Sequence, residues 1–250
     1  MAGPSPDSTW DALFSDFYLR AYADEERREE ARAQALGAAR LTGLEPGQEL
    51  LDVPCGFGRH AIPLAGAGYR VTAVDRSAVL LDEARRRAGS ERWPKFVQAD
   101  YRDLPFRDES FDAAVNLFTS LGYLGDEGDA RVLAEIRRVL RPGGRLVIET
   151  AHRDALVLDW SESDYRWMGE GRVLLEQRTF DAAAGIATTT QTLIDGAGER
   201  DARTWSVRVY TGTELLAMAA GAGFGDVKAY GDFDGSPFTP RTRLVVVARR

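Results

Sequence analysis

The stretch Leu51–His60, which reads LDVPCGFGRH, holds the densest set of chemically useful residues in the chain. A cysteine stands beside two glycines in the spacing Gly56-x-Gly58, and a histidine follows. Four interpretations fit such a stretch: a nicotinamide-binding turn, a phosphate loop, a thiol nucleophile with its base, or a turn that holds another ligand. The phosphate loop is excluded because no Gly-Lys-Ser/Thr follows the glycines.

Cys55 and His60 invite the interpretation of nucleophile and base, because a thiol near the start of a helix can have a lowered pKa. The two residues are separated by a turn, and no third group that would orient the histidine is evident. Small buried cysteines are common in protein cores. We therefore expect Cys55 to be a buried structural residue and His60 to open the following helix.

Asp52, Asp75 and Asp100 each close a short apolar segment that is typical of a buried strand. The carboxyl ends of parallel strands meet at one edge of a sheet, and doubly wound folds bind their ligands there. Asp75 is at the distance from the glycines at which dinucleotide enzymes hold a ribose hydroxyl. Asp52 stands where those enzymes keep apolar residues, and a carboxylate there suits a ligand that carries a positive group.

Strands and helices alternate through the first 150 residues of the chain. The expected strands lie at 48–54, 69–75, 95–100, 111–118 and 144–151, and the expected helices at 11–42, 58–68, 77–89 and 128–140. This alternation predicts an α/β fold with a doubly wound, mostly parallel sheet and helices on both of its faces. A helix at 212–223 and two final strands, one of them antiparallel, extend the predicted sheet to seven strands.

The pattern changes between residues 152 and 210. From about Trp167 onward, segments rich in threonine, valine and aromatic residues are separated by glycine-bearing turns, which predicts an antiparallel three-stranded β-meander inserted after the fifth strand. We expect a single domain over residues 1–250, with an N-terminal helical cap at 1–45. The insertion at 152–210 is expected to serve as a lid, a substrate wall or a dimer surface.

Composition and charge narrow the class of protein. The net charge of -7 and the pI of about 5.1 argue against a nucleic-acid partner, which usually requires a basic surface. No apolar run is long enough to cross a membrane, and the N-terminus lacks the basic-then-apolar pattern of a secretory signal. Because Cys55 is the single cysteine and the two histidines are His60 and His152, we expect no internal disulfide, no metal site and a cytoplasmic location.

Five segments in order resemble the motifs of the class I S-adenosylmethionine-dependent methyltransferases. They read ELLDVPCGFGRHAIPLA, VTAVDRS, VQADYRDLPF, FDAAVNLFTSLGY and VLRPGGRLVIE. The resemblance covers roughly residues 46–150, and the whole chain resembles a bacterial subgroup of small-molecule-type enzymes that begin with a helix like YLRAY. It implies an enzyme that moves the methyl group of S-adenosylmethionine to an N, O or C atom of a small molecule by in-line displacement, with S-adenosylhomocysteine as the product.

The resemblance also implies which residues hold the cofactor. Gly56 and Gly58 form the turn under its methionine portion. Asp52 faces its ammonium group directly or through water, and Asp75 takes both ribose hydroxyls. Further contacts are implied at the adenine end and at the floor near the sulfonium: Arg76, Asp100 and Tyr101; Asn116 and Phe118. On the first helix, the resemblance implies that Tyr18, Arg20 and Tyr22 cap the cofactor and that Arg20 pairs with its carboxylate. Tyr18 and Tyr22, four positions apart, fit one packed helix face equally well.

Methyl transfer needs little from side chains, because the sulfonium methyl is already activated and catalysis consists mainly of alignment. His152 follows the fifth strand and is the candidate base or acceptor-orienting group, with Tyr123 as a second candidate; a structural His152 that bonds a loop backbone fits equally well. The fourth strand lacks the Asn/Asp-Pro-Pro-Tyr/Phe turn of enzymes that methylate nucleobases or glutamine, which favours a small-molecule acceptor. Trp167 and Arg178 are the expected acceptor contacts, and a homodimer through the insertion is a further option.

Two other functions remain open. A nicotinamide oxidoreductase is disfavoured because the chain has no Tyr-x-x-x-Lys pair and because Asp52 is misplaced for that cofactor. A non-catalytic module that binds the methyl-donor cofactor or its product would keep the same residues at the sheet edge, so the sequence is compatible with it.

Overall fold

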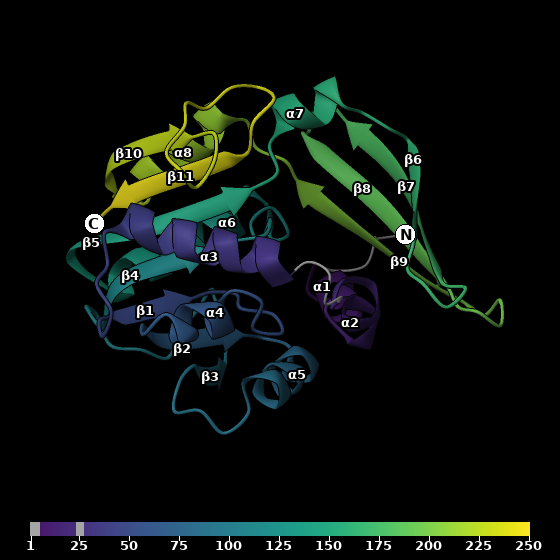
Figure 1. Cartoon of the computed structure of the whole chain (residues 1–250). Helices are drawn as coiled ribbons and strands as arrows, with labels where there is room; N and C mark the ends of the chain where they lie inside the picture. Colours follow the sequence, from purple (N-terminus) through teal and green to yellow (C-terminus); the bar gives the residue numbers. More distant parts are fainter. Residues whose placement is uncertain (1–5, 24–27) are drawn as a thin grey trace.

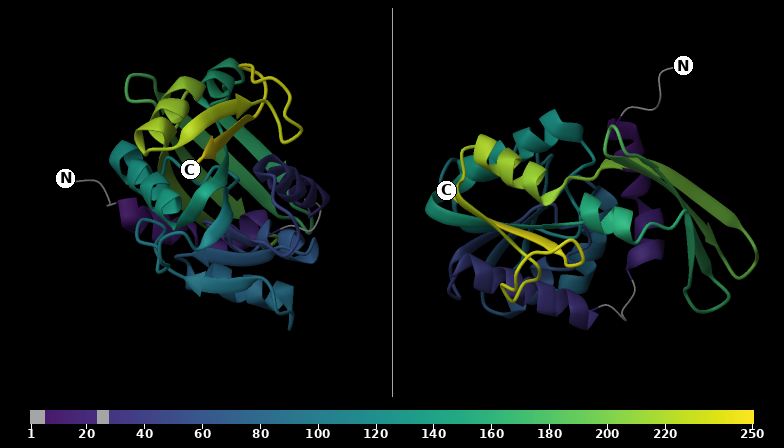
Figure 2. Two further views of the ribbon diagram at one scale, coloured as in Figure 1. Left: turned by 90° about the vertical axis from the view of Figure 1, so that its left-hand side faces the viewer. Right: turned by 90° about the horizontal axis from the view of Figure 1, so that it is seen from above.

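The computed structural model describes residues 6–23 and 28–250 of the 250-residue chain. Within these residues, a central α/β unit carries a second, smaller sheet to one side (Figure 1). Two short N-terminal helices lie between the central unit and the smaller sheet, as the view from above also shows (Figure 2).

The central sheet has seven strands in the described part of the chain, in the order β10-β11-β5-β4-β1-β2-β3. They are β1 (Glu49–Asp52), β2 (Arg70–Asp75), β3 (Lys95–Gln98), β4 (Phe111–Asn116), β5 (Leu140–Thr150), β10 (Gly225–Tyr230) and β11 (Leu244–Arg249). Neighbouring strands are parallel, except that β11 runs antiparallel to both β5 and β10. The chain returns after β3 to the other side of β1, so the strand order reverses between β1 and β4. The predicted doubly wound, mostly parallel sheet is confirmed.

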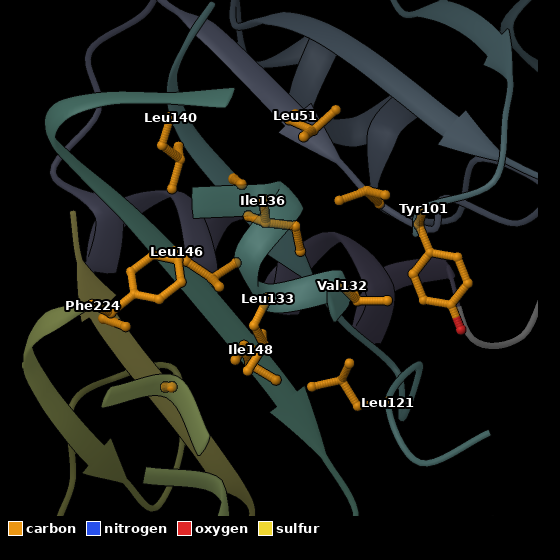
Figure 3. Packing of buried hydrophobic residues seen from close by; sticks show 14 of the residues in the cluster. Leu51, Tyr101, Leu121, Val132, Leu133, Ile136, Leu140, Leu146, Ile148 and Phe224 are labelled. Carbon is orange, nitrogen blue, oxygen red and sulfur yellow. The ribbon is translucent and has the colours of Figure 1, made fainter. Parts of the chain in front are cut away.

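Helices cover both faces of the central sheet. On one face, the first core lies between the sheet and α3 (Arg28–Thr42), α4 (Ala61–Gly66) and α5 (Ala78–Ala88). On the other face, the second core lies between the sheet and α6 (Gly125–Val139) and α8 (Gly212–Gly221). Successive strand residues point to opposite faces, so Leu50 packs in the first core and Leu51 in the second. On α6, Val132, Leu133 and Ile136 share one helix face and fill the second core (Figure 3).

The helix predicted at 11–42 is several helices in the structure. These are α1 (Pro6–Leu13), α2 (Asp16–Tyr22) and α3, and residues 24–27 of the predicted helix lie outside the described residues. The break between α1 and α2 falls at Ser15, whose backbone is extended and whose hydroxyl oxygen accepts a hydrogen bond from the Phe17 N–H at 3.4 Å. A serine in this conformation starts a new helix by satisfying a backbone donor that has no partner within the helix.

The inserted sheet, called sheet B below, is antiparallel as predicted but has four strands instead of three in the described residues. It follows α7 (Arg153–Leu158) and consists of β6 (Ser163–Trp167), β7 (Val173–Asp181), β8 (Ile186–Ile194) and β9 (Arg200–Arg208). The additional strand is β6, which pairs with β7 at the sheet edge. Its sequence, SDYRW, contains polar residues that strands disfavour, so pairing with β7 decides its conformation.

The two faces of sheet B differ in what covers them. Phe17 of α2 packs against Leu174 of β7 and Leu193 of β8 in a buried cluster on the inner face. Tyr165 and Trp167 of β6 stand on the opposite face and are largely exposed, at 63% and 69%. Sheet B thus holds the N-terminal helices toward the central unit. No helix among the described residues has the length and apolar character that a membrane crossing requires.

Candidate functional site

A cavity of about 210 Å³ lies at the carboxyl edge of the central sheet, beside the ends of β1, β2 and β4. The strand register aligns Asp52 of β1 with Ala73 of β2 and Val115 of β4, so the turns that leave these strands meet in one place. The N-terminal helices and β9 close the cavity from the outside. Its wall is largely aromatic: Trp10, Phe14, Tyr18, Tyr22, Phe57, Phe118, Tyr123 and Trp205.

The turn between β1 and α4 forms one side of this cavity. Gly56 and Gly58 have φ values of 54° and 81°, which glycine adopts without the steric cost that other residues meet. A Cβ on Gly56 would meet no atom of the described structure within 4 Å, whereas a Cβ on Gly58 would lie 3.0 Å from Ile62. Gly56 therefore leaves open space where a ligand can approach the backbone, and Gly58 allows close packing onto α4.

Asp52 ends β1 and is buried, with 1% of its surface exposed, and it is not among the residues that line the cavity, whereas its neighbours Pro54, Cys55 and Gly56 are. Neither carboxylate oxygen has a hydrogen-bond partner among the described residues. Burial raises the pKa of Asp52 well above its usual value, and the nearby Asp75 carboxylate adds to this shift, while the backbone amide of Ala61 opposes it. A buried carboxyl group without a partner is costly, and a cationic ligand group would relieve that cost.

Asp75 ends β2 and lines the cavity. Its Oδ2 accepts the Gly56 N–H at 2.8 Å, and its Oδ1 accepts the Ser77 N–H at 2.9 Å. Burial raises the pKa of Asp75 to about 6, although these backbone hydrogen bonds act in the opposite direction. Each carboxylate oxygen can accept a second hydrogen bond, so Asp75 can hold two neighbouring hydroxyl groups of a ligand.

Asp100, Tyr101 and Arg76 lie near this edge but do not line the cavity. The Asp100 carboxylate pairs with Arg102 at 2.6 Å and lies 3.8 Å from Arg76. Burial raises the pKa of Asp100, but the two arginines outweigh it and the net pKa is lowered. Arg76 also pairs with Asp11 of α1 at 3.1 Å. The hydroxyl of Tyr101 is buried without a hydrogen-bond partner among the described residues.

The α2 helix presents two faces, and the predicted cofactor residues fall on both. Tyr18 and Tyr22 line the cavity, and their ring centroids lie 4.7 Å apart. Arg20 points elsewhere and pairs with Asp16 at 3.1 Å and with Asp201 of sheet B. The structure thus brings the two tyrosines to the cavity and leaves Arg20 outside it.

Arg59 is a cavity residue that the sequence reasoning missed. It follows Gly58 directly, and its guanidinium lies 4.2 Å from the centroid of the Phe118 ring. Its position immediately after the second glycine of the turn is the feature of the sequence that could have identified it as a cavity residue. A cation here can pair with an anionic group of a ligand that also contacts the glycine turn.

His60 and Cys55 also line the cavity, but their environments disfavour a nucleophile and its base. Burial raises the pKa of the Cys55 thiol, and the nearby Asp75 and Asp52 carboxylates raise it further. Burial, together with the charge of Arg59, lowers the pKa of His60 to about 3. His60 Nε2 lies 3.3 Å from the side-chain oxygen of Gln34 on α3. The thiol stays protonated and the imidazole stays neutral at physiological pH.

The segment that follows β4 forms the remaining wall. Asn116, the last residue of β4, is fully buried and does not line the cavity; its Nδ2 donates to the Val53 carbonyl at 2.7 Å, and its Oδ1 has no partner among the described residues. Phe118 and Tyr123 line the cavity, and the Tyr123 ring meets Phe14 edge-on at 5.3 Å. Burial raises the pKa of Tyr123, and Tyr22 adds to the shift, so its phenol stays protonated.

His152, the candidate base, does not line the cavity. Its Nε2 lies 2.8 Å from the Thr242 carbonyl and its Nδ1 accepts the Ala155 N–H at 3.4 Å, at the start of α7. Because Nε2 must carry the proton to donate to a carbonyl, both ring nitrogens are engaged with the backbone. This geometry corresponds to the structural alternative for His152.

The expected acceptor contacts in the insertion also lie outside the cavity lining. Trp167 is on the exposed outer face of sheet B. Arg178 of β7 is half-buried and forms an ion pair with Glu176. Trp205 of β9 is the sheet B residue that lines the cavity. No group of three or more His, Cys, Asp or Glu suited to a metal ion occurs among the residues that the structure describes.

Comparisons with known proteins point to one group. Residues 50–144 match a family described as a methyltransferase domain. The chain is 32% identical over 216 residues to a cypemycin N-terminal methyltransferase from a Streptomyces species, covering 82% of this chain and 84% of that protein. It is 41% identical over 102 residues to the demethylmenaquinone methyltransferase of Clavibacter sepedonicus, which covers 41% of this chain and 40% of the relative. The chain thus aligns with about half or less of the length of the relatives with the strongest local similarity.

Solved structures share the fold over nearly the whole chain. The CcbJ methyltransferase from Streptomyces caelestis has a TM-score of 0.80 at 23% identity, covering 96% of this chain and 97% of that one. CalS10 from Micromonospora echinaspora, described as an amino pentose methyltransferase with bound S-adenosylmethionine, has a TM-score of 0.71 at 23% identity, covering 94% and 96%. The similarity therefore includes sheet B and the N-terminal helices as well as the central sheet.

Proposed function

This chain belongs to the S-adenosylmethionine-dependent methyltransferases, and from that premise we propose that it transfers the cofactor's methyl group to an amine nitrogen of a small molecule. The cofactor part of this proposal rests on the polar groups around the glycine turn. The proposal that the acceptor is an amine rests on the aromatic wall of the cavity and on the protonation states of the titratable groups that line it.

The buried Asp52 carboxylate carries the cofactor part of the proposal. Both of its oxygens lack a partner among the described residues, and the cofactor's ammonium group supplies the missing cation. Asp75 has free acceptor capacity on both oxygens for the two ribose hydroxyls, and the open space beside Gly56 admits the methionine portion. The residues present therefore fit S-adenosylmethionine.

Arg59 supports a different assignment for the cofactor's carboxylate from the one that the motif resemblance implied. Arg59 lines the cavity, whereas Arg20 is paired on the far side of α2. Tyr18 and Tyr22 also line the cavity. We propose that Arg59 binds the carboxylate and that the tyrosines enclose the cofactor.

The absence of an available base among the described cavity residues favours an amine acceptor. Burial keeps His60 neutral with a pKa of about 3 and keeps the phenol of Tyr123 protonated. Asp75, with a pKa of about 6, holds two backbone amides and, in the proposed complex, the two ribose hydroxyls. An amine needs no side-chain base if it reacts in its neutral form, and transfer into a buried aromatic site lowers the pKa of an ammonium group. The cypemycin relative, which spans most of the chain, is named for an N-terminal methylation, and CalS10 for an amino sugar.

In this mechanism the chain aligns the acceptor and excludes water. When bound, the cofactor supplies a methyl group on a sulfonium, activated for in-line attack. Phe118 and Tyr123 hold the acceptor from the β4 side, and Trp205 closes the cavity from sheet B. Their aromatic faces stabilise the positive charge that develops on the nitrogen, and its proton then leaves to solvent.

The proposal is tested by binding and turnover together. Calorimetry is expected to detect binding of S-adenosylmethionine and S-adenosylhomocysteine, with no binding of NAD at the same concentration. Transfer of a labelled methyl group should then occur with members of a panel of primary and secondary amines, including amino sugars and peptide N-termini. Hydroxyl, thiol and quinol compounds of similar size serve as comparison acceptors.

Each outcome of this test separates the functions that remained open. Preferential binding of NAD would contradict the methyltransferase assignment. Turnover on quinols or hydroxyls but not on amines would contradict the amine proposal alone. Cofactor binding without turnover on any acceptor would favour the non-catalytic binding module.

We also propose that the chain forms a homodimer through the outer face of sheet B and acts in the cytoplasm. Tyr165 and Trp167 are exposed on that face beside Leu175, which is 38% exposed. Exposed apolar groups gathered on one face are typical of an interaction surface. Cys55, the single cysteine, is a buried free thiol, in keeping with a reducing compartment.

A further inference from the structure

Two consecutive residues of the cavity wall have a left-handed backbone. Phe118 and Thr119, directly after β4, have φ values of 64° and 53°. Neither is glycine, and threonine is β-branched, so this conformation is unfavourable unless other contacts enforce it. Both residues line the cavity at the end of the strand, where the proposed acceptor binds. Some feature of the surrounding structure must therefore hold this turn.

Glu149 of β5 makes the contacts that hold it. Its carboxylate Oε2 accepts the Phe118 N–H at 2.8 Å, and its backbone carbonyl accepts the Thr119 N–H at 3.2 Å. The Thr119 hydroxyl oxygen accepts the Ala151 N–H at 3.0 Å, which ties the same turn to the end of β5. Glu149 thus engages both left-handed residues, one through its side chain and one through its backbone.

The carboxylate of Glu149 is buried and needs a counter-charge, which Arg243 supplies. Arg243 immediately precedes β11, and its Nη1 lies 3.2 Å from Glu149 Oε1. Its Nη2 lies 2.9 Å from Glu30 of α3, and its Nε lies 3.8 Å from Asp232. Glu30 also accepts the Gln34 side-chain amide at 2.9 Å, and Gln34 contacts His60 in the cavity wall. The turn after β4 is thereby connected to α3 and, through Gln34, to His60 of the cavity wall.

We propose that Glu149 is a positioning residue for methyl transfer, which holds the Phe118–Thr119 turn in the shape that aligns the acceptor. Glu149 is not among the cavity-lining residues, so it acts through the backbone of its neighbours. This inference rests on the proposed function for its catalytic consequence. Its structural part, the hydrogen bond from Phe118 to a carboxylate, is testable without turnover.

The experiment compares Glu149→Ala with Glu149→Gln in the full-length protein. The alanine variant removes the acceptor for the Phe118 N–H, and we expect kcat to fall about 10- to 100-fold while the affinity for S-adenosylhomocysteine changes by less than about threefold. The glutamine variant keeps a carbonyl oxygen at that position, and we expect it to recover most of kcat. In NMR spectra, the Phe118 amide proton is expected to shift upfield in both variants, and further in the alanine variant, because a carboxylate acceptor deshields it most.

Glu214→Ala is the matched control. Glu214 likewise accepts a backbone N–H, from Thr211 at 2.7 Å, and pairs with an arginine, Arg208 at 2.6 Å, but Thr211, unlike Phe118, does not line the cavity. We expect this variant to lose stability while kcat stays within about twofold of the wild type.

Three results would overturn the inference. The first is an unchanged Phe118 amide resonance in Glu149→Ala, and the second is a folded alanine variant with kcat within twofold of the wild type. The third is that the alanine and glutamine variants lose kcat to the same extent and lose cofactor affinity as well, which would indicate a general structural role. Should the alanine variant fail to fold, the glutamine variant and its NMR shift decide the question. A wild-type protein that transfers no methyl group would contradict the proposed function instead, and the NMR comparison would still test Glu149.

Discussion

Asp52 and Asp75 end neighbouring strands, and burial raises the pKa of both carboxyls, to about 6 for Asp75. Between pH 3.8 and about 6 the folded state binds more protons than the unfolded chain at Asp75, so the free energy of unfolding decreases as the pH rises through this window. The protein therefore keeps two carboxyl groups at a position that costs stability when they ionise, as expected at a ligand site.

The raised pKa values predict that cofactor binding releases protons. An ammonium group beside Asp52 and hydroxyl donors at Asp75 favour the ionised carboxylates, so binding lowers both pKa values. At pH 6, calorimetry with S-adenosylhomocysteine is expected to give enthalpies that differ between buffers of different ionisation enthalpy, in the direction of proton release. The affinity should rise as the pH increases from 5 to 7.

Asp52→Asn tests the origin of these protons, with Asp82→Asn as the control. The asparagine at position 52 cannot ionise, so the number of protons released and the affinity are both expected to fall. Asp82 is an exposed acid on α5 whose pairing with Arg85 is local, and its variant should behave like the wild type. Identical enthalpies in all buffers would contradict the assignment of the ammonium group to Asp52.

At the scale of elements, Arg59 lies in the turn between β1 and α4 and lines the cavity, whereas Arg20 lies on the face of α2 that points away from it. We predict that Arg59→Met lowers the affinity for S-adenosylmethionine by about 10-fold or more, because a charge-assisted hydrogen bond to the carboxylate is lost. Arg20→Met is expected to leave the affinity within about twofold, since Arg20 pairs with Asp16 and Asp201 outside the cavity. Fluorescence or calorimetric titration measures both.

A ligand that lacks the carboxylate makes this comparison specific. Decarboxylated S-adenosylmethionine should bind wild type and Arg59→Met with similar affinity, because the group that Arg59 recognises is missing from it. A large loss with Arg20→Met and none with Arg59→Met would restore the assignment that the motif resemblance implied.

The sequence predicted the parts of this molecule that follow from local rules. Alternating strands and helices determine a parallel sheet, and Asp52 and Asp75 must then lie at its carboxyl edge because strand ends meet there. Trp167 and Arg20 could not be placed in the same way. Shifting β6 by one residue exchanges the faces of Trp167 and Arg166, and only the pairing with β7 sets that register.

The same limit applies to residues whose role depends on distant partners. Glu149 reads as an ordinary strand residue, and its importance arises from the backbone conformation of Phe118 and from Arg243, far away in the sequence. His152 stands at a strand end as expected, but Thr242 and α7 take both of its ring nitrogens. Sequence reasoning located the edge of the sheet, whereas tertiary contacts decided which side chains face the cavity.

At the scale of the whole molecule, the two faces of sheet B have different surroundings. Its inner face packs on Phe17 of α2 and supplies Trp205 to the cavity, so the insertion supports the N-terminal helices that enclose this cavity. Its outer face presents Tyr165, Trp167 and Leu175 away from the central unit. An insertion that closes the site on one side is thus free to carry an interface on the other.

The proposed homodimer predicts that Trp167→Glu weakens self-association. A charge in the centre of an apolar interface removes a large aromatic contact and remains desolvated, so we expect the dimer dissociation constant to rise by about 30-fold or more. Sedimentation velocity over a range of concentrations measures this change. Val79→Glu is the matched control, since Val79 is 45% exposed on α5, away from sheet B, and its variant should dimerise like the wild type. A wild-type chain that sediments as a monomer at every concentration would contradict the dimer, and the exposed face of sheet B would then need a different partner.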